Sequence, residues 1–203
     1  TLLSAFCAKL HNSALSVGAQ NCHEEIDYGA FTGNVNAKMI KNLGAKYIIL
    51  GHSENRANGD TDITINKKIN SALKQKLTVI FCIGETLAQK KSKETNRIIR
   101  KQITQGLKGF KKNSRIIIAY EPVWSIGTGI IPKNHELEKN IKFINSTISK
   151  NTKLKKIKVL YGGSVNPKNI QSFNAINILD GYLIGGASQN AKKLIDIVSK
   201  SYN

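Results

Sequence analysis

The sequence predicts an α/β fold in which parallel strands alternate with helices and close toward a barrel. Short β-branched runs recur along the chain, and the longer segments between them carry apolar residues at helical spacing. The runs are apolar at nearly every position, which is typical of parallel strands buried on both faces. At 203 residues and 40 % hydrophobic content, residues 1–203 are expected to form a single domain.

Six segments are predicted as strands: Ser16–Gln20, Tyr47–Leu50, Thr78–Ile83, Ile116–Glu121, Ile157–Tyr161 and Gly181–Ile184. An open doubly wound sheet is the competing architecture. It would carry a glycine-rich nucleotide loop after its first strand, whereas Asn21-Cys22-His23-Glu24 follows the first run here. We therefore predict a barrel, and because a closed barrel of this kind has eight strands, an incomplete one of about six βα units.

The segments between the strands predict amphipathic helices that pack on the sheet. Gly44 stands where a helix is expected to end in a left-handed cap. Two apolar stripes are expected to face the core: Ile63, Ile65, Ile69 and Leu73 on one helix, and Ile141, Ile144 and Ile148 on another.

The net charge of +18 raises the question of a nucleic-acid partner. Lysines are spread over every polar helical segment, and aromatic residues, which stack on bases, make up only 6 % of the chain. We interpret the charge as solvated surface and expect no nucleic-acid partner. A positive field would still attract a small anionic substrate.

No apolar run reaches membrane-spanning length, so no membrane partner is expected. The three cysteines, Cys7, Cys22 and Cys82, are an odd number without framework spacing, which favours a reducing cytoplasm. Neither Cys7 with His11 nor Cys22 with His23 forms a paired-ligand pattern, and no metal site is expected.

The segment IAYEPVWSIGTGI, residues 118–130, is the most informative in the chain. A buried run ends in Glu121, and a stiff proline and then a glycine-spaced loop follow it. Active sites of parallel α/β folds lie at the carboxyl ends of strands. A carboxylate there, beside a loop able to close, suits proton abstraction in a site that excludes water.

Another strand end carries His52, which should lie on the same rim as Glu121. A base and a hydrogen-bond donor are the two parts needed to enolise a carbonyl compound, because one takes the proton from carbon and the other stabilises the oxygen. The last two predicted strands end in Gly162-Gly163-Ser164 and Gly185-Gly186. Bare backbone N–H groups at such ends suit a phosphate.

These motifs together resemble the triosephosphate isomerase family over nearly the whole chain. The matching segments are VGAQN (17–21), GAFTG (29–33), ILGHSE (49–54), CIGET (82–86), AYEPVW with IGTG (119–129), YGGSV (161–165) and DGYLIGGAS (180–188). The resemblance implies a (β/α)8 TIM barrel that interconverts dihydroxyacetone phosphate and glyceraldehyde 3-phosphate in glycolysis and gluconeogenesis, with no cofactor.

The resemblance also implies a role for each residue that matches the family's motifs. Glu121 would be the base, His52 the neutral electrophile that polarises the carbonyl, and residues 122–129 the closing loop. Cys82 would support the base, Glu85 would hold the loop, and Glu54 would pair with a catalytic lysine. The substrate phosphate would bind to Gly127, Ser164, Gly185 and Gly186.

Three departures accompany the resemblance. Thr1 aligns just after the family's second strand, so two strands and the first helix, with the family's N-x-K lysine, are expected to be missing from this chain. Ile130 and Asn55 stand where the family commonly has basic residues. A second interpretation therefore stays open: a truncated or decayed homologue that binds phosphate or a partner without catalysis.

The loop Gly29-Ala30-Phe31-Thr32-Gly33 has an apolar tip between two glycines. By the resemblance it inserts into a neighbouring subunit, with Thr32 near the catalytic groups. A homodimer is expected for the complete protein.

Overall fold

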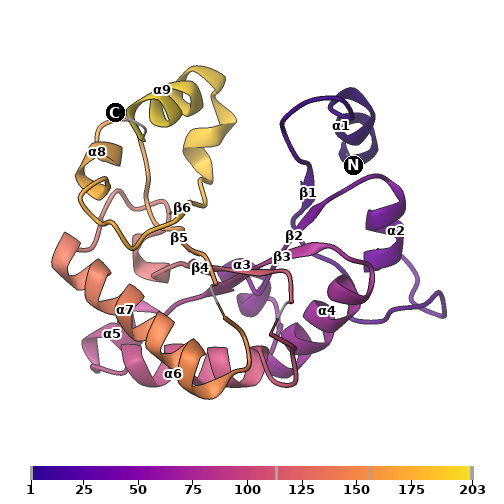
Figure 1. Ribbon diagram of the computed structural model, residues 1–203, viewed down its shortest axis with the longest axis horizontal. Coiled ribbons are helices and arrows are strands. Elements are labelled where there is room, and N and C mark those ends of the chain that lie inside the picture. Colours follow the sequence, from indigo (N-terminus) through magenta and orange to yellow (C-terminus); the bar gives the residue numbers. More distant parts are fainter. Residues whose placement is uncertain (1, 113, 156, 202–203) are drawn as a thin grey trace.

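The computed structural model describes residues 2–112, 114–155 and 157–201. Its sheet has six parallel strands in the order β1-β2-β3-β4-β5-β6, so strands that follow one another in sequence also pair (Figure 1). The sheet curves into an incomplete (β/α) barrel, as predicted. The strands are β1 (Gly18–Ala19), β2 (Tyr47–Leu50), β3 (Thr78–Ile83), β4 (Ile116–Tyr120), β5 (Val159–Tyr161) and β6 (Gly181–Tyr182).

The strands β2 and β3 have the predicted bounds, whereas the others are shorter than predicted. β1 and β6 are the edges of this sheet, and a strand that pairs on one side only supports a shorter hydrogen-bonded ladder. β4 ends at Tyr120, one residue before the predicted end, so Glu121 is the first residue beyond the strand.

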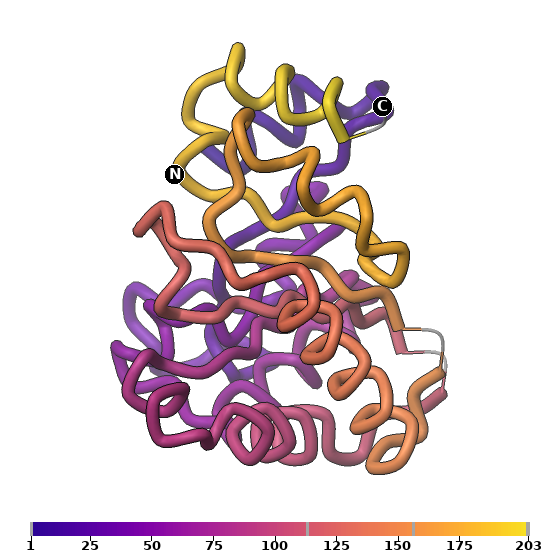
Figure 2. The backbone as a smooth tube through the Cα atoms, turned by 90° about the vertical axis from the view of Figure 1, so that its left-hand side faces the viewer, coloured from indigo at the N-terminus to yellow at the C-terminus, as the bar shows by residue number. Residues whose placement is uncertain are grey.

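The helices cover the outer face of the sheet (Figure 1). The first and last helices, α1 and α9, lie at the same end of the molecule, at the top of both views (Figures 1 and 2). The α-helices are α1 (Leu3–Lys9), α2 (Ala37–Asn42), α3 (Ser53–Ala57), α4 (Asp62–Lys74), α5 (Leu87–Lys91), α6 (Thr95–Gly106), α7 (Asn134–Asn151), α8 (Ile170–Phe173) and α9 (Ala191–Ser201); η1 (Val123–Ser125) and η2 (Gly186–Gln189) are 3₁₀ turns. None of the helices in the described ranges combines the length and apolar composition that crossing a bilayer requires.

The core lies between the sheet and these helices. The stripe Ile141, Ile144 and Ile148 on α7 is buried, as predicted, and Gly44 follows α2 with φ +97°, the predicted cap. The prediction for Ile63 was wrong, because its side chain is 67 % exposed. Two residues before Ile65, it points away from the buried stripe of α4.

Among the described residues, Lys68 departs from the prediction that the lysines lie on the solvated surface. Lys68 occupies a buried position on α4, and its Nζ atom lies 2.7 Å from the Asp60 Oδ2 atom. A buried ammonium group needs such a partner. The assignment of Lys68 to solvent was therefore wrong.

Candidate active site

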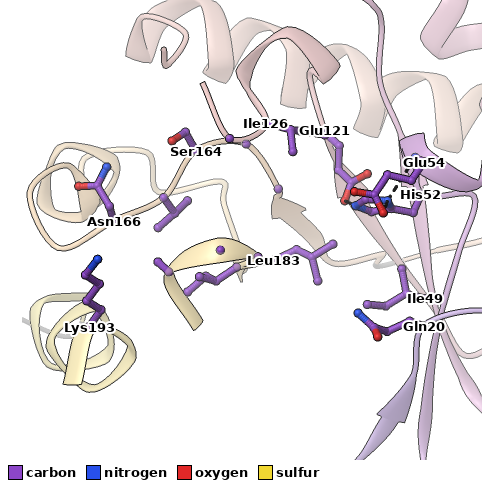
Figure 3. A pocket seen from close by; sticks show the side chains of 18 of the residues that line it. Gln20, Ile49, His52, Glu54, Glu121, Ile126, Ser164, Asn166, Leu183 and Lys193 are labelled. Carbon is purple, nitrogen blue, oxygen red and sulfur yellow. Dashed lines mark hydrogen bonds and ion pairs between the residues drawn. The ribbon is translucent and has the colours of Figure 1, made fainter. Parts of the chain in front are cut away.

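The carboxyl ends of the strands open onto a cavity of about 750 Å³. Segments that follow β1, β2, β4, β5 and β6 contribute to its lining. Figure 3 shows His52, Glu54 and Glu121 at one side of this cavity and Ser164 at the other. The cavity brings together these sequence-predicted residues: His52, Glu54, Glu121, Gly127, Ser164, Gly185 and Gly186.

Glu121 is held at its position by close backbone packing. Its N–H donates to the Ile83 carbonyl at 2.7 Å, which continues the β3–β4 ladder by one residue. A Cβ atom at Gly84 would overlap the Glu121 carbonyl, and one at Gly162 would lie 2.7 Å from Glu121 Cγ. Both glycines are therefore needed for the glutamate to sit where it does.

Burial raises the pKa of Glu121 to about 7. The side chain is only 3 % exposed, and desolvation disfavours the carboxylate. A hydrogen bond from the Cys82 thiol, one from the Ser53 backbone and the positive charge of Arg56 lower the pKa in part. A carboxyl group with a pKa near 7 can both accept and return a proton at neutral pH.

Cys82 lies behind this carboxylate at the end of β3. Burial, and then the Glu121 charge, raise the pKa of its thiol well above the ordinary value. The thiol therefore keeps its proton and can donate it in a hydrogen bond to Glu121. Its location fits the supporting role that the sequence suggested.

His52 caps α3 and directs one ring nitrogen toward Glu121. Its Nδ1 atom accepts from the Glu54 N–H at 3.4 Å. In the neutral ring the proton is then on Nε2, which lies 3.6 Å from Glu121 Oε1. The Glu54 side chain is 84 % exposed, with Oε2 3.9 Å from His52 Nδ1.

The start of the loop after β4 is fastened to Glu85. The Trp124 indole N–H donates to Glu85 Oε1 at 2.9 Å, and the Tyr120 hydroxyl donates to Oε2 at 3.1 Å. The Val123 N–H also donates to the Glu85 carbonyl at 3.0 Å. Burial raises the pKa of Glu85, and the indole and phenol donors oppose that rise.

The far end of the same loop is fastened by Ser125, which is fully buried. Its hydroxyl donates to the Ile130 carbonyl at 2.6 Å and lies 2.9 Å from the Tyr161 hydroxyl. The Ser164 N–H donates to the same oxygen at 3.3 Å. One side chain thus connects the loop to the glycine-rich segment after β5.

A family model described as triosephosphate isomerase matches residues 1–201. The chain belongs to the triosephosphate isomerase family. It is 39 % identical to a triosephosphate isomerase of Geotalea uraniireducens over 204 residues, which is 98 % of this chain and 81 % of that protein. It is 42 % identical to one of Alkaliphilus metalliredigens over 205 residues, 98 % of this chain and 82 % of the relative.

A solved structure leads to the same family. The crystal structure of triosephosphate isomerase from Bartonella henselae aligns with a TM-score of 0.91 and 34 % identity, covering 100 % of this chain and 84 % of that chain. The predicted family and the predicted incomplete barrel are both confirmed.

Sequence reasoning missed three side chains in this triosephosphate isomerase fold: Arg56, Tyr120 and Ser125. Arg56 donates from Nε to the Gly51 carbonyl at 2.8 Å and from Nη2 to the Cys82 carbonyl at 3.2 Å, and it pairs with Asp62. It thus supports the segment that carries His52 and the end of β3, where Cys82 lies behind Glu121. The sequence did contain a signal for Arg56. Asn55 stands where the family commonly has a basic residue, and Arg56 directly follows it.

Proposed function

We propose that this cavity interconverts dihydroxyacetone phosphate and glyceraldehyde 3-phosphate by proton transfer through an enediol or enediolate. The observation that carries the proposal is the pair of Glu121, with a pKa of about 7, and His52, with Nε2 3.6 Å from the carboxylate. The chemistry moves protons between neighbouring carbon and oxygen atoms, for which one base and one hydrogen-bond donor suffice.

Each group has one task in the proposed cycle. The Glu121 carboxylate removes a proton from the carbon beside the carbonyl, and the electron pair of that C–H bond moves onto the carbonyl oxygen. The Nε2–H of His52 donates to that oxygen and stabilises its negative charge. The proton of the hydroxyl group on the deprotonated carbon passes to the first oxygen, relayed through His52 Nε2, so that a new carbonyl forms there. The protonated Glu121 then returns its proton to the former carbonyl carbon, which yields the other triose phosphate.

The phosphate group is proposed to bind at the opposite wall of the cavity, on Gly127, Ser164, Gly185 and Gly186. No Cβ atom narrows the approach to Gly185 and Gly186, and the space beside both residues is open. Binding there would hold the substrate while leaving Glu121 and His52 to act on its carbon end. Closure of the loop at residues 122–129 would exclude water.

The cellular setting is part of the proposal. The activity would serve glycolysis and gluconeogenesis in the cytoplasm, since Cys7, Cys22 and Cys82 are free and buried. We propose a homodimer for the complete protein through residues 29–33, where Phe31 is 39 % exposed beside the 61 % exposed Tyr28. Exposed aromatic residues on one loop are typical of an interface.

The deciding experiment compares the 203-residue chain with its Glu121→Gln variant. Isomerase rate and triose phosphate binding are measured for both, with Glu138→Gln on the surface of α7 as a control that makes the same chemical change. We expect turnover to fall on the order of a hundredfold or more in Glu121→Gln while binding persists, because a base acts in the transition state.

Two other outcomes are decisive. A Glu121→Gln rate within a fewfold of the parent would refute Glu121 as the base. Tight substrate binding with no turnover in the parent chain would instead support the second interpretation from the sequence, a homologue that binds phosphate without catalysis.

A further inference from the structure

The amino ends of the strands hold a second cavity, of about 330 Å³, at the end of the sheet opposite to the active site. At roughly 30 Å³ per molecule of liquid water, it has room for a small multiply charged ion. Its lining consists of Ser16, Lys41, Lys46, Tyr47, Lys76, Thr78 and Arg115. We call this cavity the floor site.

The register of the sheet explains why these residues meet. Tyr47 at the start of β2 pairs with Thr78 at the start of β3. The Thr78 N–H donates to the Lys46 carbonyl, and the Val79 N–H donates to the Arg115 carbonyl. The residues at the amino ends of β2, β3 and β4 therefore lie side by side at the same end of the sheet.

Among the residues that the structure describes, the lining has four cationic groups and no carboxylate. Within the described residues, none of Lys41, Lys46, Lys76 and Arg115 has a carboxylate oxygen within ion-pair distance. Like charges gathered in one hollow repel one another unless an anion enters it. The hydroxyl groups of Ser16, Tyr47 and Thr78 add neutral donors to the same lining.

Arg115 lies at the same end of the sheet, directly before β4. Its Nη1 atom donates to the Lys76 carbonyl at 3.2 Å, which places the guanidinium group beside β3. Within the described residues its other N–H groups have no hydrogen-bond partner. A guanidinium group with a fixed plane suits bidentate binding of phosphate oxygens.

Lys76 itself stands in a backbone conformation that favours glycine. Its φ is +59°, and it follows Gln75, the residue that caps α4. The Lys76 N–H donates to the Leu73 carbonyl, and the Leu77 N–H donates to the Ala72 carbonyl. This is a Schellman cap, and glycine is the usual residue at its left-handed position. A lysine there carries backbone strain.

We infer that the floor site binds a small anion that carries two phosphate groups, independently of the active site. Four cations around one 330 Å³ cavity supply more positive charge than a single phosphate needs. The ligand is small because the cavity has a volume of only about 330 Å³.

The chain offers a matched pair of variants to test this. Lys93 also has a positive φ, +58°, at the Schellman cap after α5, but it does not line the floor site. Lys76→Gly and Lys93→Gly each remove one charge and relieve the same backbone strain. Both variants should therefore fold at least as stably as the parent without ligand.

Pyrophosphate binding to the 203-residue chain is measured by calorimetry, and backbone amide NMR shifts locate the bound ion. We expect the dissociation constant to rise about tenfold in Lys76→Gly and in Arg115→Gln, since each loses a charge-assisted hydrogen bond. Lys93→Gly should stay within about twofold of the parent. Amide shifts should change at Tyr47 and Thr78.

Three results would overturn the inference. Equal weakening in Lys76→Gly and Lys93→Gly would show attraction by the net charge of +18 alone. Shifts confined to Gly127 and Gly185 would place pyrophosphate in the active site. Tighter binding of a single-stranded oligonucleotide than of pyrophosphate, lost in Lys76→Gly, would assign the floor site to nucleic acid.

Discussion

The Nε2 atom of His52 lies 3.6 Å from the Oε1 atom of Glu121, although the two residues follow strands that are not neighbours in the sheet. β3 separates β2 from β4, and Gly84 directly after β3 has no Cβ atom to displace the Glu121 backbone. The proposed base and its hydrogen-bond donor are thus brought together by a residue that takes part in no chemistry.

The first prediction concerns the pH dependence of activity. The carboxylate form of Glu121 is the base, and its pKa is about 7. We therefore expect kcat/KM to rise with pH through about this value and then to level off. A pH profile of the 203-residue chain measures it, with the Glu138→Gln variant expected to give the same curve. A flat profile across this range would contradict the assignment.

The second prediction concerns stability. A carboxyl group whose folded pKa is raised contributes stability that is present below its unfolded pKa and is lost as pH rises through its folded pKa. For Glu121 this window runs from the ordinary value of 4.5 to about 7. Across it the contribution falls by about 3 kcal/mol, at 1.36 kcal/mol per pKa unit.

Glutamine cannot ionise, so Glu121→Gln should gain stability relative to the parent as pH rises across that window. Urea unfolding of both proteins below and above the window measures the difference in unfolding free energy. Glu138→Gln serves again as the control for a changed net charge. A difference between Glu121→Gln and the parent that does not vary with pH would show that burial does not govern the titration of Glu121.

The third prediction concerns Gly84. In Gly84→Ala the new methyl group would overlap the Glu121 carbonyl, so one strand end must move. We expect a loss of about 3 kcal/mol or more in stability, together with loss of activity. Gly186→Ala is the control for stability, because the space beside Gly186 is open. Equal unfolding midpoints for the two variants would refute the packing argument.

Much of this architecture could be predicted from the chain alone. Continuous apolar runs identified the strands, and parallel strands place all their carboxyl ends at one rim, which was enough to join His52 with Glu121 before any distance was known. The contacts that each helical side chain makes were harder to predict. Ile63 lies outside the core because a stripe inferred from spacing does not reveal which side the sheet is on.

The surroundings of the charged side chains were the least predictable feature of the chain. Lys68, Lys76 and Lys93 look alike in the sequence, yet the first is buried against Asp60, whereas the other two are exposed and only Lys76 lines the cavity at the strand starts. Their surroundings come from the register of neighbouring strands and from helix ends, which link distant segments. Periodicity describes one segment at a time and cannot supply such contacts.

The last prediction concerns the attachment of the loop to Glu85. Trp124→Phe removes the indole N–H, so the buried Glu85 carboxylate keeps only the Tyr120 hydroxyl among its side-chain donors in the described residues. We expect the variant to lose about 1–3 kcal/mol of unfolding free energy, the cost of a missing hydrogen bond to a charged group.

A double-mutant cycle separates this bond from the packing of the indole ring. Glu85→Gln keeps the shape of the side chain and removes its charge, so in that background Trp124→Phe should cost less. The coupling between the two changes should exceed about 0.5 kcal/mol, the level at which contacting residues differ from independent ones. Additive costs in urea unfolding would mean that the Trp124 side chain holds the loop through its ring alone, which packs against the loop and lies 3.5 Å from the Nζ atom of Lys90.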